Sequence, residues 1–123
     1  MKILVTGAGG FIGLRLLKRL LSDGHEVVAL VRSVRGELKL PRERLTVVKG
    51  DMTDATSLDR AAAGCDVVVH LANATSVTDW AVARAVNVEG TRTLLAACQR
   101  AGVKRLVFTS TISALREHRG PYG

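Results

Sequence analysis

Five apolar runs in this chain are continuous rather than alternating with polar residues, and stretches with helical spacing separate them. A continuous apolar run suits a strand of a parallel sheet, because such a sheet is covered on both faces. The predicted strands are Lys2–Thr6, Glu26–Val31, Leu45–Lys49, Asp66–Leu71 and Val103–Thr109.

Three helices are predicted between these strands. Phe11–Ser22 places its leucines at helical spacing; Asp54–Ala63 has an aspartate as N-cap and a glycine after its last turn; a long helix runs from about Asp79 to Ala101. The charged segment 33–44 is predicted as a loop. Strands and helices in this alternation predict a doubly wound α/β sheet of Rossmann order 3-2-1-4-5 with right-handed crossovers. We expect one dinucleotide-binding domain over residues 1–123, without the later strands of a complete fold.

A glycine-rich turn joins the first strand to the first helix. Residues 6–13 read TGAGGFIG, which fits the spacing G-x-x-G-x-x-G through Gly7, Gly10 and Gly13. In such a turn one glycine bends the chain, one lets backbone approach a pyrophosphate, and one lets the helix pack on the strand. The helix N-terminus, here at Phe11 and Ile12, offers free N–H groups and a positive dipole end to phosphates.

The end of the second strand carries a cation. In a dinucleotide fold an acid about 20 residues past the glycine turn binds the ribose 2′-hydroxyl. Arg32 stands in that place, with Ser33 and Arg35 close by. A guanidinium can bind a 2′-phosphate that a carboxylate would repel. The sequence therefore favours NADP(H) over NAD(H), unless Arg32 only faces solvent.

Composition excludes several other classes of protein. No apolar run approaches the roughly 20 residues of a membrane-spanning helix, and no secretory signal begins the chain, so we expect a cytoplasmic protein. Cys65 and Cys98 are expected to be buried as small hydrophobes, with no metal site. The net charge of +7 comes from basic residues spread over helices. Aromatic residues make up only 3%, which argues against nucleic-acid binding by base stacking.

Several short motifs, taken in order and spacing, resemble the extended or atypical short-chain dehydrogenase/reductase superfamily, in its NAD(P)-dependent epimerase/dehydratase-like branch. The resemblance covers essentially the whole chain. The motifs are TGAGGFIG at 6–13, GDM at 50–52, HLA at 70–72, NVEGT at 87–91, GVKR at 102–105 and FTST at 108–111.

The resemblance implies roles for matching positions. Asp51 and the backbone of Met52 resemble the residues that contact the adenine. The stretch 71–73 (Leu71, Ala72 and Asn73) resembles the segment along the nicotinamide ribose. Asn87 resembles the asparagine that bridges the long helix to the loop after strand four, although a helix-interior polar residue bonded to backbone fits it equally. His70 is expected to be a structural residue at a strand end.

The resemblance also implies catalytic positions after strand five. A Ser or Thr there polarises the substrate carbonyl, and Thr111, beside Ser110, fits this place. The family's chemistry also uses a Tyr-x-x-x-Lys pair. Tyr122 is the only tyrosine, and no lysine follows it in these residues. Tyr122 either begins that pair or has no role.

Two function classes follow. The first is the NADP(H)-binding module of a short-chain reductase or epimerase-like oxidoreductase, inactive as these residues alone. The second is a non-catalytic NADP-binding sensor or accessory subunit. In either case strand five is expected at an edge of the sheet, where it could pair with another copy in a homodimer.

Overall fold

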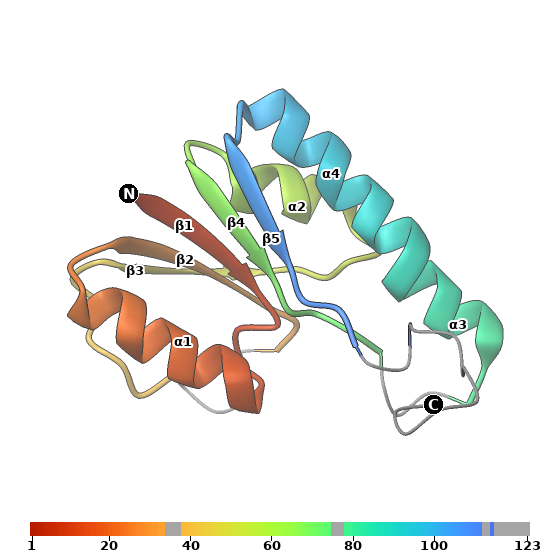
Figure 1. Cartoon of the computed structure of the whole chain (residues 1–123), viewed down its shortest axis with the longest axis horizontal. Coiled ribbons are helices and arrows are strands. Elements are labelled where there is room, and N and C mark those ends of the chain that lie inside the picture. The colour runs from red at the N-terminus through yellow and green to blue at the C-terminus, as the bar shows by residue number, and fades with distance from the viewer. Residues whose placement is uncertain (34–37, 75–77, 112–113, 115–123) are drawn as a thin grey trace, which may run out of the picture.

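A five-stranded parallel sheet organises the computed structural model, which describes residues 1–33, 38–74, 78–111 and 114 (Figure 1). Its strands follow the order β3-β2-β1-β4-β5, which confirms the predicted Rossmann arrangement. Two of them, β4 and β5, are shorter at both ends than the sequence predicts, although flanking residues such as Asp66 and Lys104 still donate backbone hydrogen bonds to the neighbouring segment of the sheet. The strands are β1 (Lys2–Thr6), β2 (Glu26–Val31), β3 (Leu45–Lys49), β4 (Val67–His70) and β5 (Arg105–Phe108).

Both faces of the sheet are buried at its centre, in β1 and β2, as continuous apolar strands require, whereas β5 at the edge is largely exposed. Helix α1 (Phe11–Ser22) covers one face, while α2 (Ala55–Ala62) and α4 (Gly90–Ala101) cover the other (Figure 1). Successive residues of β1 alternate between these layers: Ile3 packs with Leu17 of α1, whereas Leu4 packs with residues of α2 and α4. Two separate apolar cores result, one on each side of the sheet.

The α2–α4 core contains both cysteines. Cys65 and Cys98 are buried and unbridged, as the sequence predicts, and burial raises the pKa of both thiols. Asp54 is the N-cap of α2, with its carboxylate accepting a hydrogen bond from the Ser57 amide at 3.2 Å. None of the helices in the described ranges is long and apolar enough to cross a membrane.

The predicted long helix is interrupted, which corrects the expectation of one regular helix. Its ends are as predicted, at the N-cap Asp79 and the left-handed Gly102, but it divides into α3 (Trp80–Arg84), a π-helical turn η1 (Ala85–Glu89) and α4. A π turn inserts one extra residue into the helical spacing and re-aims the side chains beside it. Here the turn contains Asn87.

Gly90 brings the start of α4 close to the loop after β3. A Cβ atom at position 90 would lie 2.7 Å from the Met52 Cβ and 3.0 Å from the Met52 carbonyl oxygen. Only glycine therefore allows this helix to approach the residue that follows Asp51. The contact ties the helix layer to the carboxyl end of the sheet.

We predict that Gly90→Ala destabilises the chain by about 1–3 kcal/mol, because overpacking must displace either α4 or the Met52 loop. Helix propensity alone would act oppositely, with a gain of about 1 kcal/mol. Urea unfolding measures the sign, and Gln99→Ala on the exposed face of α4 is the control. A Gly90→Ala variant more stable than the wild type would refute the close packing.

Candidate functional site

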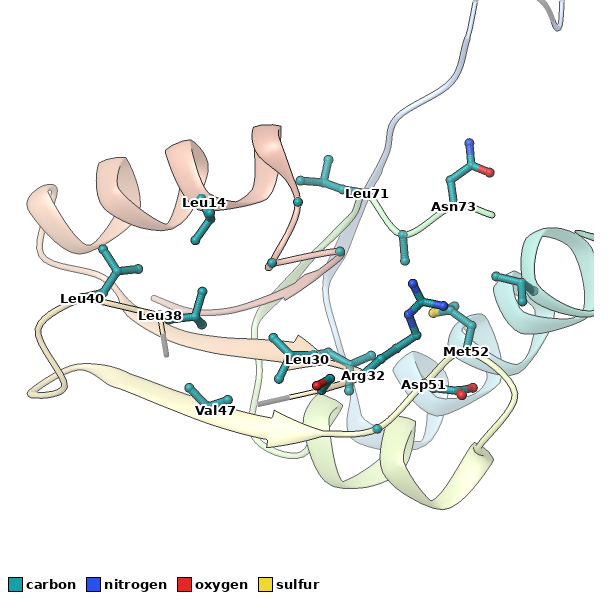
Figure 2. A pocket seen from close by; sticks show the side chains of 18 of the residues that line it. Leu14, Leu30, Arg32, Leu38, Leu40, Val47, Asp51, Met52, Leu71 and Asn73 are labelled. Atoms are coloured by element: carbon teal, nitrogen blue, oxygen red, sulfur yellow. The ribbon is translucent and has the colours of Figure 1, made fainter. Parts of the chain in front are cut away.

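A cleft of about 980 Å³ opens at the carboxyl ends of β1, β2 and β4 (Figure 2). This is where the strand order reverses direction from β1, so the loops on either side separate and leave a crevice. The predicted cofactor residues that line it are Gly7, Gly10, Arg32, Ser33, Asp51, Met52, Leu71, Ala72 and Asn73.

The glycine turn forms the part of the cleft nearest α1. Gly7 has a positive φ of 69°, and its carbonyl accepts a hydrogen bond from the Gly10 amide at 3.1 Å. A Cβ at Gly7 would come within 2.8 Å of the Ala72 nitrogen, so this turn lies directly against the chain that leaves β4. A Cβ at Gly13 would collide with the Gly7 carbonyl oxygen and with Ala8. Gly7 therefore makes the sharp turn and Gly13 the close helix–strand packing.

The N-terminus of α1 follows this turn. Gly10 is its N-cap, no side chain caps it, and no acidic residue lies in its first turn. The side chains of Phe11 and Ile12 are exposed and do not line the cleft, and the Phe11 ring packs under the Arg15 guanidinium at 4.4 Å. A phosphate in the cleft would meet these two residues through backbone N–H groups, which are available at any helix start.

Charged residues lie at the β2–β3 side of the cleft. Figure 2 shows the Arg32 side chain extending from the end of β2 toward the middle of the cleft. The Asp51 carboxylate accepts hydrogen bonds from the Thr53 hydroxyl and amide, at 2.5 and 2.6 Å. These bonds, followed by the charge of Arg32, lower the pKa of Asp51. Asp51 is therefore an anion with a fixed orientation, and its neighbour Met52 is buried.

Further cations in the cleft lining carried no recognisable signal in the sequence. Lys18 of α1 and Lys39 and Arg42 of segment 38–44 join Arg32 there. They belong to no motif, because their common position depends on how α1 and the segment before β3 pack. In the sequence, a lysine on a helix or in a charged loop indicates only a side chain that faces solvent.

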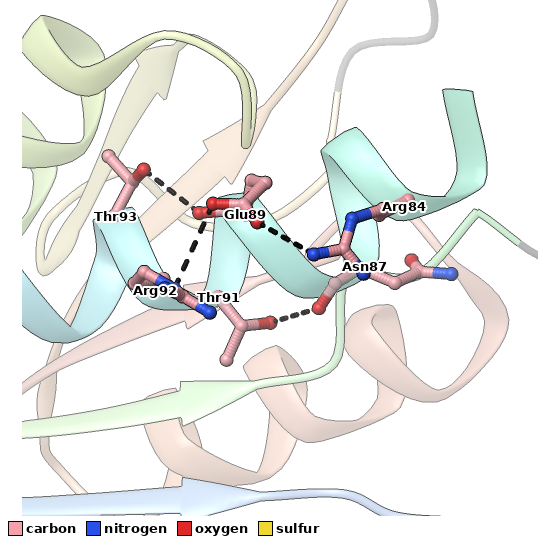
Figure 3. Close-up of polar contacts among 6 residues, drawn as sticks. All are labelled: Arg84, Asn87, Glu89, Thr91, Arg92 and Thr93. Carbon is pink, nitrogen blue, oxygen red and sulfur yellow. Dashed lines mark hydrogen bonds and ion pairs between the residues drawn. The ribbon is translucent and has the colours of Figure 1, made fainter. Parts of the chain in front are cut away.

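The loop after β4 is tied to the π turn. The side-chain oxygen of Asn87 accepts from the Ala74 amide at 2.8 Å, and its nitrogen donates to the Ala74 carbonyl at 3.4 Å. The Asn87 carbonyl in turn accepts from the Thr91 hydroxyl at 2.7 Å (Figure 3). Asn87 thus makes the bridge that the resemblance implies, rather than only a bond within its own helix. Ala74, which it holds, lines the cleft.

The same helical segment is reinforced on its exposed side. The Glu89 carboxylate forms ion pairs with the guanidinium groups of Arg84, at 3.4 Å, and Arg92, at 3.8 Å (Figure 3). The Glu89 backbone carbonyl accepts a hydrogen bond from the Thr93 hydroxyl. These charged side chains are half-exposed or more, so each pair contributes little to stability. Asn87 is the residue of this segment that acts on the cleft.

Two of the predicted catalytic residues stand apart from the cleft lining. Ser110 and Thr111 follow β5 and are exposed. Tyr122 and the predicted cofactor residue Arg35 lie outside the described residues. Within the described ranges, no group of three or more His, Cys, Asp or Glu side chains could hold a metal ion.

Comparison with known proteins identifies the family of the chain. The model of a family described as the NAD dependent epimerase/dehydratase family matches residues 3–120. The chain belongs to this family. Its fold and its glycine turn are those of an NAD(P)-binding module.

Similar proteins include reductases. A 2-alkyl-3-oxoalkanoate reductase of Stenotrophomonas maltophilia is 39% identical, over 98% of this chain and 36% of its own length. Tetraketide alpha-pyrone reductase 1 of Arabidopsis thaliana is 38% identical, over 94% of this chain and 39% of its own length. The chain thus spans little more than a third of these relatives.

Solved structures with NAD share the fold. The Thermus thermophilus UDP-glucose 4-epimerase in complex with NAD has a TM-score of 0.79 at 33% identity, covering 91% of this chain and 38% of the epimerase. The Bordetella bronchiseptica enzyme WbmG in complex with NAD has a TM-score of 0.77 at 36% identity, covering 88% of this chain and 36% of the enzyme.

We predict that Asn87→Ala loosens the loop that follows β4. It removes two hydrogen bonds to Ala74, which we expect to cost about 1–3 kcal/mol, because typical bonds contribute about 0.5–1.5 kcal/mol each. Asn87→Asp keeps the acceptor and loses the donor. Its free energy of unfolding should therefore lie between those of the wild type and Asn87→Ala. Urea unfolding gives the stabilities, and amide exchange at Ala74 gives the local effect. Unchanged exchange at Ala74 in the alanine variant would show that the bridge does not hold the loop.

Proposed function

We propose that these 123 residues are the NADP(H)-binding domain of a cytoplasmic, short-chain reductase or epimerase-like oxidoreductase. The observation that carries the cofactor choice is the position of Arg32. It lies at the end of β2, in the cleft, where an acid would otherwise bind a ribose 2′-hydroxyl. The glycine turn and the uncapped N-terminus of α1 would hold the pyrophosphate. The loop after β4 would hold the nicotinamide half.

The charge of the lining supports a 2′-phosphate. Lys18, Arg32, Lys39 and Arg42 are the cations among the described lining residues, and Asp51 is the carboxylate. Asp51 is already bonded twice to Thr53, so it has less capacity left for a ribose hydroxyl. A phosphate placed near Arg32 would gain charge-assisted hydrogen bonds, which are roughly twice as strong as neutral ones.

The relatives support hydride transfer for the whole protein. The Stenotrophomonas and Arabidopsis relatives named above are reductases, which favours an oxidoreductase over a nucleotide sensor. In this proposal Thr111, with Ser110 beside it, donates a hydrogen bond to the substrate carbonyl, and Tyr122 belongs to the proton-transfer pair. Because Ser110 and Thr111 stand outside the cleft lining, and because no lysine follows Tyr122 in these residues, we expect the 123 residues alone to bind cofactor without reducing a carbonyl.

Titration calorimetry with NADPH and NADH tests the cofactor choice. We expect NADPH to bind at least roughly tenfold more tightly, a difference of about 1.4 kcal/mol. Arg32→Ala should weaken the binding of NADPH by roughly tenfold or more, because it removes a charge-assisted contact. The affinity for NADH should stay nearly unchanged.

Arg92→Ala is the matched control, since Arg92 is an exposed cation of α4 outside the cleft lining. It should change neither affinity, which separates a local contact from a general loss of positive charge. Equal binding of the two cofactors by the wild type, or tighter binding of NADH, would refute NADP(H) and favour NAD. The NAD complexes of the structural neighbours would then describe this chain too.

We also propose that β5 pairs with β5 of a second copy. It is an edge of the described sheet, and Val107 and Phe108 on it are 44% and 57% exposed. Exposed edge strands with apolar side chains tend to pair. We predict concentration-dependent dimers in sedimentation, and a monomer for Val107→Lys, whose charge blocks the edge. A wild-type chain that stays monomeric at high concentration would rule out this pairing.

A further inference from the structure

A buried polar row crosses the carboxyl end of the sheet, and it has no counterpart among the sequence-predicted site residues. Thr6 at the end of β1 and His70 at the end of β4 are 0% and 2% exposed, and they are aligned partners in the strand register. The Thr6 hydroxyl lies 2.6 Å from His70 Nδ1. On the other side, His70 Nε2 lies 3.0 Å from the Thr91 hydroxyl of α4.

Counting donors fixes the direction of every bond in this row. The Thr6 oxygen accepts from the Leu71 and Ala72 amides, both at 3.2 Å, which uses its two lone pairs. Its single proton must therefore be donated to His70 Nδ1, which has to be unprotonated. The neutral ring then carries its proton on Nε2 and donates to Thr91, whose own proton goes to the Asn87 carbonyl.

The surroundings keep the ring neutral. Burial lowers the pKa of His70, so the ring carries no charge at neutral pH. Within the part of the chain that the structure describes, its ring contacts Thr6, Thr91 and the Phe108 ring, whose centroid is 5.5 Å away, and none of these three groups carries a charge. A second ring proton, on Nδ1, would meet an oxygen whose lone pairs are both in use.

The amides that this row holds belong to the cofactor cleft. Leu71 and Ala72 line it, and the Gly7 turn rests against the peptide between them, with a Cβ at Gly7 only 2.8 Å from the Ala72 nitrogen. The Thr6 hydroxyl oxygen is the acceptor of the Ala72 amide and, together with the Thr6 carbonyl oxygen at 3.3 Å, of the Leu71 amide. It therefore links the end of β1 directly to the peptide against which the Gly7 turn packs.

We propose that His70 is a positioning residue of the dinucleotide site: its unprotonated Nδ1 orients the Thr6 hydroxyl, and this holds the Leu71 and Ala72 amides against the glycine turn in the binding geometry. The role rests on the dinucleotide binding proposed above, but not on the choice between NADP and NAD. His70 itself need not touch the cofactor.

The first test is the tautomer. Nitrogen-15 shifts of the His70 ring in the whole chain should show an unprotonated Nδ1 and a protonated Nε2 at pH 7.5. A ring protonated on Nδ1 would overturn the proposal, because Thr6 could then not hold both amides. This measurement needs no variant and no ligand.

The second test uses NAD⁺ as the probe, because it lacks the 2′-phosphate and its affinity is therefore independent of the contact proposed for Arg32. His70→Phe fills the space of the imidazole but offers no acceptor to the Thr6 hydroxyl. We expect it to weaken the affinity for NAD⁺ by about fivefold, the usual effect of one hydrogen bond. It should also speed amide exchange at Leu71 and Ala72 more than at Val28 in the core. His70→Asn, with an oxygen in place of Nδ1, should restore most of the affinity. His25→Asn, at the opposite end of the sheet, is the control.

The outcomes separate this proposal from the proposed function. Equal NAD⁺ affinity in the wild type and a folded His70→Phe variant would overturn the role of His70 and leave cofactor binding intact. If His70→Phe fails to fold, the NAD⁺ affinity of His70→Asn and the ring tautomer of the wild type decide whether the role of His70 stands. A wild-type chain that binds neither NAD⁺ nor NADP⁺ would overturn the proposed function, and the cofactor role of His70 with it.

Discussion

The contact between the Gly7 turn and the peptide of Leu71 and Ala72 fixes the geometry of the cleft. It brings together the ends of β1 and β4, which are neighbours in the sheet but 64 residues or more apart in the chain. Backbone can approach backbone this closely only where a side chain is missing, and only glycine adopts the positive φ of 69° without strain. This approach sets how closely the glycine turn and the β4 loop, two walls of the crevice, lie together.

Local patterns in the sequence were sufficient for the fold. Continuous apolar runs mark strands buried on both faces, so the strand order and the two helix layers followed from general rules of α/β proteins. The turn at Gly7 and the stop at Gly102 were equally readable, because each residue type has a local conformational reason to be there. The π turn was not readable from the sequence: it contains Asn87, whose side chain pairs with Ala74, and such a contact between separate segments leaves no local pattern.

The site divides along the same line. The place of Gly7 and Arg32 in the cleft could be predicted because each directly follows a strand whose end is visible in the sequence, whereas Asp51 was predicted from the resemblance of the GDM motif at 50–52. The buried row through Thr6 and His70 could not be derived in full, because its direction depends on lone pairs shared between two strands, β1 and β4, and the helix α4. One signal was present: both are polar residues ending apolar strands, and the strand order 3-2-1-4-5 makes those two strands adjacent. A polar pair at such a position has to be mutually satisfied, since burial leaves no water to bond.

His70 also links the cofactor cleft to the segment expected to do the chemistry. Its backbone carbonyl accepts from both the Thr109 hydroxyl, at 3.1 Å, and the Thr109 amide, at 3.3 Å. Thr109 directly precedes Ser110 and Thr111, so the start of that segment is fixed by the same residue whose ring orients Thr6. Cofactor and carbonyl-binding groups must be held in one geometry for hydride transfer, since a displacement of about 1 Å can cost a hundredfold in rate. A single buried residue bonded on both sides is a short physical route to that common geometry.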